Sequence, residues 1–222
     1  MIPIEVSAFK NFINNQKINF YTYLILITKI PLDLIEFLIR NISGPVGFIL
    51  RRYYYKTRLK KMGSNVFIDV GVHFIGHKNI SLDDFVYVDK YCLITVLSSL
   101  EIGKRVHIGS FNIIHAGLNG DIKIGDYVGC SANTTIYSSI EKNLPNKRLS
   151  GPMIPYSEKA TSGKPINLEK DSFISPNCLI LPGVNIGYGA IISPNTVVKK
   201  NIKELSIVDN SCNEIKKREF NL

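Results

Sequence analysis

Near its C-terminal end the sequence carries an aliphatic residue at every sixth position, without interruption, from Leu168 to Val198. An α-helix repeats its apolar face at about 3.6 residues and a strand at about 2, so this spacing fits neither element alone. It fits a chain that coils around a triangular prism and turns a corner after each short strand. Each aliphatic side chain then stacks on its equivalent in the next coil. We therefore predict a parallel β-solenoid.

The same spacing begins near Gly63 and is interrupted three times. The predicted inward residues are Ile68, Phe74, Ile80, Val86 and Cys92, then Ile102, Ile108 and Ile114, then Ile124, Cys130 and Ile136, and finally Leu168, Ile174, Ile180, Ile186, Ile192 and Val198. Short register slips follow Leu97 and lie near Asn119, and one long irregular excursion spans 137–167. Long excursions from a regular scaffold are usually functional or disordered. The predicted corner residues, which turn at little cost, are Pro176, Asn177, Pro182, Gly183, Gly187, Gly189, Pro194 and Asn195.

Outside the repeats we expect an N-terminal helical segment at 1–62, the solenoid at 63–205, and a final strand and basic helix at 206–222. Residues 20–50 are very apolar, but charges and Pro31 break them into runs shorter than the ~20 residues of a membrane span. We predict two short helices that meet at Pro31. Two interpretations of 20–61 stay open: a cap on the first coil, or a surface that lies on an anionic membrane. Residues 1–19 show no signal-peptide pattern.

Composition limits the partners. The formal charge of +9 and the pI of about 9.3 favour phosphate-bearing ligands, anionic glycans or an anionic membrane. The basic runs lie outside the repeats and no nucleic-acid-binding motif is present, so we do not expect nucleic acid. Cys92, Cys130 and Cys178 have no paired spacing and are expected as buried residues in a reducing compartment.

Three stretches resemble known families. Residues 174–202, ISPNCLILPGVNIGYGAIISPNTVVKKNI, resemble the left-handed β-helix acyltransferases of the hexapeptide-repeat family. Residues 107–139, HIGSFNIIHAGLNGDIKIGDYVGCSANTTIYSS, and the later GPMIP resemble sugar acetyltransferases of surface-polysaccharide biosynthesis. Residues 43–68 resemble the lead-in of polysaccharide O-acetyltransferases. The resemblance covers 43–218 and implies a left-handed β-helix, a homotrimer and acetyl-CoA as the donor.

Acetyl transfer to a sugar hydroxyl needs a base that titrates near neutral pH, which favours histidine. His115 follows the inward Ile114, has the small Ala116 and Gly117 beside it, and matches a histidine of the related branch. We therefore expect His115 to be the catalytic base. The alternative is a corner histidine that hydrogen-bonds a neighbouring coil.

The residue that orients His115 is left open among Asp121, Asp126 and Glu141. His107 ranks second as a site histidine, and His73 and His77 are expected at the surface. Relatives often carry their histidine inside the excursion, and this excursion has none. The histidine spacing does not fit a zinc site, so we expect no metal.

The resemblance also suggests ligand-binding residues. Lys199, supported by Lys200 and Lys216, matches the position that meets the phosphates of coenzyme A in the family, and lysine suits phosphate. Pro176 and Pro194 stand where relatives often carry a small residue along the pantetheine arm. The residues expected to face the sugar are Tyr137, Ser138 and Ser139.

The leading functional hypothesis is an acetyl-CoA-dependent O-acetyltransferase acting on a sugar of a capsule, O-antigen or related glycan. An N-acetyltransferase of a nucleotide-linked amino sugar is the alternative within enzymes. A non-catalytic solenoid scaffold is the alternative from another class. The expected location is cytoplasmic, and contact of 20–61 with the inner membrane stays open.

Overall fold

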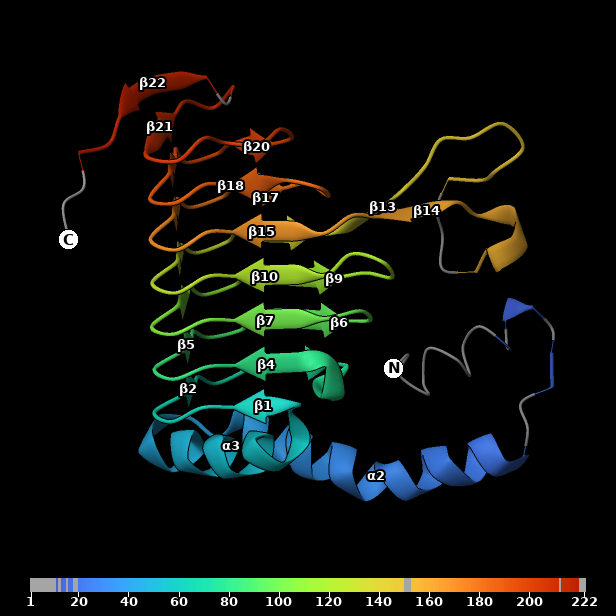
Figure 1. The fold of residues 1–222 in the computed structure, drawn as a ribbon. Helices are drawn as coiled ribbons and strands as arrows, with labels where there is room; N and C mark the ends of the chain where they lie inside the picture. Colours follow the sequence, from blue (N-terminus) through green and yellow to red (C-terminus); the bar gives the residue numbers. More distant parts are fainter. Residues whose placement is uncertain are drawn as a thin grey trace.

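The computed structural model describes residues 11, 13, 14, 16, 17, 20–149, 153–211 and 213–219. Most of residues 1–19, where no targeting signal is expected, lies outside this range. The chain forms a parallel β-solenoid of about seven turns that stands on two helices (Figure 1). The predicted fold class is confirmed.

Three parallel sheets form the faces of the prism, because each coil contributes one short strand to each face. The first sheet contains β1 (Lys61–Met62), β4 (Ile80–Leu82), β7 (Leu100–Ile102), β10 (Ile122–Ile124), β15 (Ile166–Leu168) and β18 (Asn185–Ile186). The second contains β2 (Phe67–Ile68), β5 (Tyr87–Val88), β8 (His107–Ile108), β11 (Gly129–Cys130), β16 (Phe173–Ile174), β19 (Ile191–Ile192), β21 (Ser206–Val208) and β22 (Glu214–Lys217). The third contains β3 (His73–Ile75), β6 (Leu93–Val96), β9 (Ile113–Ala116), β12 (Thr135–Tyr137), β17 (Leu179–Ile180) and β20 (Val197–Val198).

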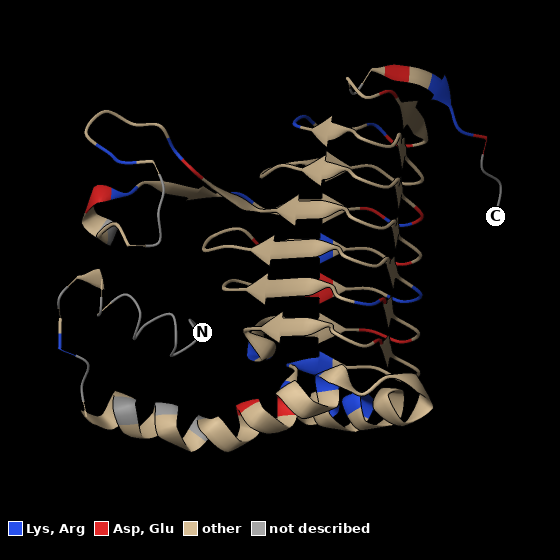
Figure 2. Ribbon diagram, turned by 180° about the vertical axis from the view of Figure 1, so that it is seen from behind, with Lys and Arg blue, Asp and Glu red and all other residues tan. Residues whose placement is uncertain are grey.

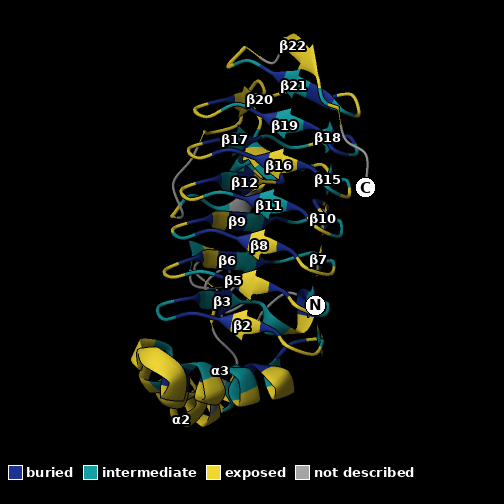
Figure 3. Ribbon diagram, turned by 90° about the vertical axis from the view of Figure 1, so that its left-hand side faces the viewer, coloured by how far each residue is buried: buried dark blue, intermediate teal, exposed yellow. Residues whose placement is uncertain are grey.

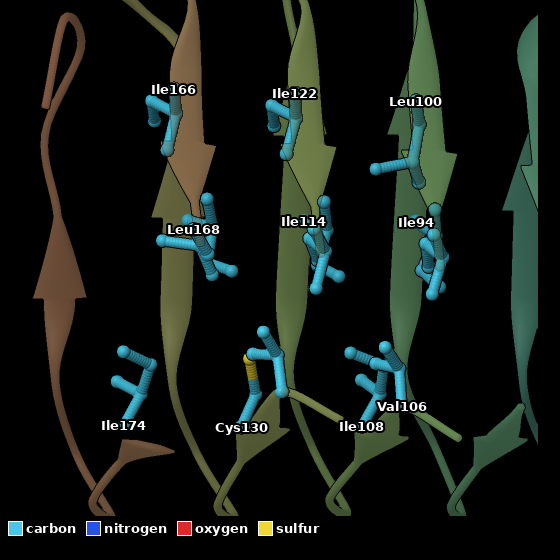
Figure 4. Close-up of a cluster of buried hydrophobic side chains, with 14 of the residues drawn as sticks. Ile94, Leu100, Val106, Ile108, Ile114, Ile122, Cys130, Ile166, Leu168 and Ile174 are labelled. Carbon is cyan, nitrogen blue, oxygen red and sulfur yellow. The ribbon is translucent and has the colours of Figure 1, made fainter. Parts of the chain in front are cut away.

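The core is a set of aliphatic columns inside the prism (Figure 4). Every residue predicted to point inward is buried. One detail of the predicted register is wrong. Val86 and Cys92 are buried, but the residues that stack on Ile68 and Phe74 are Val88 and Ile94. Each of these partners is 20 residues away and not 18, because the corner between β3 and β4 holds extra residues in a 3₁₀ helix, His77–Asn79.

Many corners place one residue in the left-handed backbone region. Asn177, Gly183, Gly189 and Asn195 do so, as their residue types predict. Other corners use residues that the sequence does not mark as turn formers. They are Phe85, Tyr91, Arg105, Phe111 and Tyr127.

The N-terminal helices are α2 (Phe20–Asn41) and α3 (Gly44–Arg58). The prediction that two helices meet at Pro31 is wrong, because α2 continues through this residue. A proline inside a helix frees the carbonyl four residues earlier, here that of Ile27. Both residues are exposed, so water can hydrate this carbonyl. Within the described part of the chain, no helix combines the length and the apolar character needed to cross a membrane.

One face of α3 packs on the first coil. The buried Arg51 donates from Nε to the carbonyl of Ile68, at 2.7 Å, and from Nη1 to the carbonyls of Ile39 and Ile42. Tyr55 is fully buried and packs edge-to-face on Phe74, with ring centroids 4.9 Å apart. Arg51 and Tyr55 therefore join α3, the end of α2 and the first coil.

Glu36 of α2 is buried in a polar cluster between the helices and the first coil. It accepts hydrogen bonds from Tyr54 and Tyr55, both at 3.2 Å, and its Oε2 lies 3.3 Å from His77 Nε2. Burial by itself raises the pKa of Glu36, but His77 and the two tyrosine hydroxyls outweigh burial and lower this pKa. The expectation that His77 is a surface residue is wrong, since its side chain lies against Glu36 and Tyr55.

At the other end, residues 214–217 form strand β22 and not the predicted basic helix. β22 pairs antiparallel with β21, so it covers an edge of the second sheet. Arg218 fixes the segment that follows, because its Nη1 donates to the carbonyls of Asp171 and Gly189. Pairing with an available sheet edge satisfies more backbone groups than one short exposed helix would.

The excursion is an arm that projects from the solenoid (Figure 1). Its base is a hairpin of β13 (Ser139–Glu141) and β14 (Thr161–Gly163). Farther out, Arg148 Nε lies 2.6 Å from Glu158, which belongs to a short 3₁₀ helix, Tyr156–Glu158. The GPMIP stretch lies partly outside the described residues.

Candidate active site

His115 lies on β9, where the third sheet meets the base of the arm. The parallel pairing of β9 with β12 places Tyr137 directly beside it. The two rings stack with centroids 4.6 Å apart and an interplanar angle of 19°. Ile114 and Ala116, the neighbours of His115 in the chain, are fully buried. The anchored strand and the stacked tyrosine together restrict the position of the imidazole.

The chemical state of His115 suits a proton acceptor. The residue is partly buried, and burial lowers the pKa of His115 below its usual value of 6.5. The imidazole is therefore neutral at neutral pH. Among the described residues, neither ring nitrogen has a hydrogen-bond partner, so Asp121, Asp126 and Glu141 do not orient it. Asp126 instead accepts a hydrogen bond from the backbone N–H of Lys104, at 2.8 Å.

Gly117 brings Ser139 and the imidazole of His115 close to the same point of the chain. A Cβ added at Gly117 would lie 3.4 Å from His115 Nε2 and would collide with the side chain of Ser139. The missing side chain therefore lets the Ser139 side chain pack closely against Gly117, so that the Ser139 hydroxyl and His115 Nε2 both lie beside this glycine. Ser139 is partly exposed, so it remains a candidate for contact with a substrate.

Ser138 has a different environment from the one that the sequence suggests. It is fully buried, and its Oγ accepts a hydrogen bond from the N–H of Gly117, at 3.0 Å. The same Oγ lies 2.5 Å from the carbonyl of Gly120 and 3.2 Å from that of His115. A substrate cannot reach a hydroxyl in this position, so the expectation that Ser138 faces the sugar is wrong. Ser138 instead fixes the turn that borders His115.

Sequence reasoning missed the second support of this turn. Ser98 also donates to the Gly120 carbonyl, at 3.0 Å. The sequence marks Asn119-Gly120 as a register slip, but nothing in the sequence pairs it with a serine from the previous coil. The turn beside His115 is therefore held by hydroxyls from two neighbouring coils.

Lys199 lies in the same column as His115. The pairings along the third sheet are His115 with Tyr137, Ile136 with Ile180, and Ile180 with Val198. Lys199 follows Val198 as Tyr137 follows Ile136, so the register continues to Lys199. Three strand steps separate it from His115, roughly 14 Å at the usual inter-strand spacing. Lys199 is exposed, so its ammonium group is accessible to an anion.

The remaining predicted site residues do not gather around His115 within one chain. Lys200 follows Lys199 and is exposed, whereas Lys216 lies on β22 in the second sheet. Pro176 and Pro194 are exposed at the corner that precedes the third sheet, at the opposite ends of the strands from Lys199.

His107 also lies apart from His115. It belongs to β8 of the second sheet, where its Nε2 lies 3.0 Å from Asp89 and its ring stacks on Tyr87. Among the described residues, no group of histidine, cysteine, aspartate or glutamate side chains is arranged to hold a metal ion.

No family model matches the chain. A dTDP-4-amino-4,6-dideoxy-D-glucose acyltransferase of Escherichia coli is 28% identical over 149 residues, which are 67% of this chain and 76% of that enzyme. A galactoside O-acetyltransferase of Lactococcus lactis is 29% identical over 108 residues, 46% of this chain and 47% of the relative. The homologues of this chain are hexapeptide-repeat sugar acyltransferases.

A solved structure matches the fold of these acyltransferases. It is an N-acyltransferase from Bacillus cereus in complex with dTDP-4-amino-4,6-dideoxyglucose and coenzyme A. The TM-score is 0.69 at 24% identity, and the match covers 77% of this chain and 89% of the other. The prediction of the acyltransferase family and of its left-handed β-helix is confirmed. Coenzyme A is bound in that structure, which agrees with the expected acyl-CoA donor.

Proposed function

We propose that the protein is an acetyl-CoA-dependent O-acetyltransferase that modifies a sugar hydroxyl of a bacterial surface polysaccharide. The observation that carries the proposal is His115, a neutral imidazole with unpartnered ring nitrogens among the described residues, beside Gly117 and the partly exposed Ser139. A sugar hydroxyl is a weak nucleophile and needs such a base. The sugar O-acetyltransferase relative and the apolar helices that precede the solenoid favour this acceptor class.

In the proposed reaction, His115 Nε2 accepts the proton of the sugar hydroxyl while its oxygen attacks the carbonyl carbon of the thioester. A C–O bond forms, the C–S bond breaks, and the sulfur leaves as the thiolate of coenzyme A, which takes up a proton. Backbone N–H groups that line the bound donor are proposed to stabilise the negative charge on the carbonyl oxygen. Tyr137 holds the imidazole, and Ser139 contacts the acceptor.

Lys199 is proposed to bind the phosphates of the donor, with Lys200 beside it. Its place in the column of His115 supports this role, because a long flexible donor lying along one edge of the prism spans both residues. We further propose a homotrimer, in which Lys216, Pro176 and Pro194 line a groove between subunits. The use of acetyl-CoA and the buried thiols of Cys92 and Cys130 support a cytoplasmic location.

A second candidate is N-acylation of a nucleotide-linked amino sugar. It is favoured by the E. coli relative, whose match covers more of this chain than that of the O-acetyltransferase. Both candidates use the same donor and the same His115. They differ in the acceptor atom, and the nature of the product separates them.

The test measures release of the coenzyme A thiol from acetyl-CoA with a panel of neutral sugars, glycan fragments and nucleotide-linked amino sugars. We expect turnover with a hydroxyl acceptor and a product whose acetyl group is removed by mild alkali, as an ester is. An alkali-stable product from an amino sugar would replace the leading proposal by the second. Donor binding without turnover on any acceptor class would favour the non-catalytic scaffold.

A further inference from the structure

The outer face of α2 and α3 is apolar and uncovered among the described residues (Figure 3). We call this surface the basal face. It consists of Phe20, Leu24, Ile27, Leu34 and Leu38 on α2 and Val46, Ile49, Leu50 and Tyr53 on α3. Their exposed fractions run from 38% for Leu50 to 79% for Phe20. Large contiguous apolar surfaces of this kind mark sites of interaction with proteins or membranes.

The contacts of α3 fix the direction of its part of the basal face. Gly47, Arg51 and Tyr55 are the buried residues of this helix, and they face the first coil. Val46, Ile49, Leu50 and Tyr53 follow helical spacing on another side, so they form one exposed stripe. This stripe points away from the solenoid.

The contacts of α2 fix the direction of its part in the same way. Glu36 points toward Tyr54, Tyr55 and His77, and so toward the solenoid. Leu34 and Leu38 lie about half a helical turn from Glu36, on the outer side. Phe20, Leu24 and Ile27 lie on the same outer side of α2, because the successive spacings from Phe20 to Leu24, Ile27 and Leu34 are four, three and seven residues. The two stripes therefore form one outward surface at the base of the solenoid.

Positive charge borders this apolar surface. The sequence from 20 to 61 contains eight lysines and arginines but only two acidic residues, Asp33 and Glu36. Glu36 is occupied in the interior. The exposed stripe of α3 continues at helical spacing from Tyr53 to the exposed Lys56, and Lys60 follows just beyond the helix end. Figure 2 shows this basic cluster at α3 and β1.

We propose that the basal face docks on the surface of an anionic lipid bilayer, and that α2 and α3 lie in the interface without crossing it. An apolar stripe bordered by lysines and tyrosines matches both the acyl boundary and the anionic headgroups. A cap for the first coil needs an apolar inner side only, so capping does not account for the apolar outer side. Charge complementarity favours lipid over a second copy of this basic chain, whose basal face would repel its like.

Docking of the basal face does not depend on the proposed reaction, but it would place the enzyme at the lipid surface. α2 extends from the same side of the solenoid as the arm formed by β13 and β14 (Figures 1 and 2). A protein docked through the basal face therefore stands upright on the membrane, with the arm overhanging the lipid surface. This orientation suits an acceptor that is held at the membrane.

The test is flotation of the full chain with vesicles of phosphatidylcholine, with and without phosphatidylglycerol. Two double variants remove the proposed contacts: Leu38→Glu with Ile49→Glu, and Lys56→Glu with Lys60→Glu. Ile215→Glu and Lys203→Glu make the same changes at exposed positions at the opposite end of the solenoid. Circular dichroism verifies that each variant is folded.

We expect the protein to float with the anionic vesicles and to be released as salt rises from about 0.1 to about 0.5 M. Each basal double variant should lower the binding constant more than tenfold. The lysine variant loses two basic residues, each worth roughly fivefold in binding near such a surface. The Leu38→Glu and Ile49→Glu variant removes buried apolar area and places two acidic groups against anionic headgroups. The two control variants should bind as the original chain does. Turnover with a water-soluble acceptor should be unchanged in the basal variants, which separates this inference from the proposed function.

Three results would overturn the proposal. The folded protein does not float with anionic vesicles; the basal and control variants float equally; or the basal variants change only the mass of the oligomer in light scattering. The last result would assign the basal face to contact between copies of the chain.

Discussion

The neighbouring serines Ser138 and Ser139 provide a sharp test of the site geometry, because the structure gives them opposite roles. Ser138→Ala removes an Oγ that accepts from the Gly117 N–H at 3.0 Å and donates to the buried turn of Gly120. Leaving buried polar groups without partners costs about 1–3 kcal/mol. For a chain of this size that corresponds to a fall of about 2–12 °C in melting temperature.

Ser139→Ala is the matched control, since it removes the same atom from a partly exposed side chain with no structural hydrogen bond of its Oγ among the described contacts. We expect its melting temperature to change by less than about 2 °C, as for most surface substitutions. Its turnover should fall if Ser139 contacts the acceptor. The assay is thermal unfolding by circular dichroism with initial rates on the same preparations. A stable Ser138→Ala beside a destabilised Ser139→Ala would refute the reasoning.

Four further predictions follow from the same geometry. His115→Ala should lower kcat about 10²–10⁴-fold and leave donor binding intact. In the original protein the rate should rise with pH through a midpoint below 6.5, because the neutral imidazole is the base and burial lowers its pKa. A midpoint well above 6.5 would contradict the argument from burial. Ile114→Ala should lower the free energy of unfolding, measured by chemical denaturation, by about 2–5 kcal/mol, since this side chain is fully buried in a column of the core. A loss under about 1 kcal/mol would contradict the stacking of Ile114 in that column. Because the pKa of Glu36 is lowered in the folded state, its carboxylate stabilises the fold at pH values above 4.5, the ordinary pKa. This stabilisation is lost as the pH falls through the lowered pKa, so α2 should be cleaved faster by a protease in that pH range. Glu36→Gln should abolish this dependence of proteolysis on pH. Lys199→Glu should weaken acetyl-CoA binding more than Lys203→Glu does, and added salt should shrink the difference.

The core could be predicted from the sequence because each face of the prism takes about six residues, so the inward residues recur at that spacing. Every residue of that period is buried in the structure. The exact partners could not be read, because a strand such as β6 buries Ile94 and Val96 as well as the preceding Cys92. Several apolar residues then fit the same period, and only the pairing of strands decides that Ile94 stacks on Phe74.

The corners show a second limit. Asn177 and Asn195 are residues that accept the left-handed region, and the sequence identifies them. Phe85, Tyr91 and Phe111 occupy the same region although bulky residues disfavour it. Their conformation is imposed by backbone hydrogen bonds to the neighbouring coils, so the backbone preferences of these residue types do not predict it.

At the site, the histidine could be selected by residue chemistry, but its surroundings could not. Whether Ser138 or Ser139 points outward depends on a single step along the chain after Tyr137. The link between His115 and Lys199 depends on the pairing of four strands separated by the excursion. Such contacts arise from the register of coils far apart in sequence, so only the structure supplies them.

The most direct test of the account is calorimetric titration of the purified protein with acetyl-CoA, with Lys199→Glu and Lys203→Glu measured in parallel. We predict binding near one site per chain, weakened by the first substitution and unchanged by the second. Absence of binding at millimolar donor would contradict the acyltransferase assignment, and equal binding by both variants would remove Lys199 from the donor site.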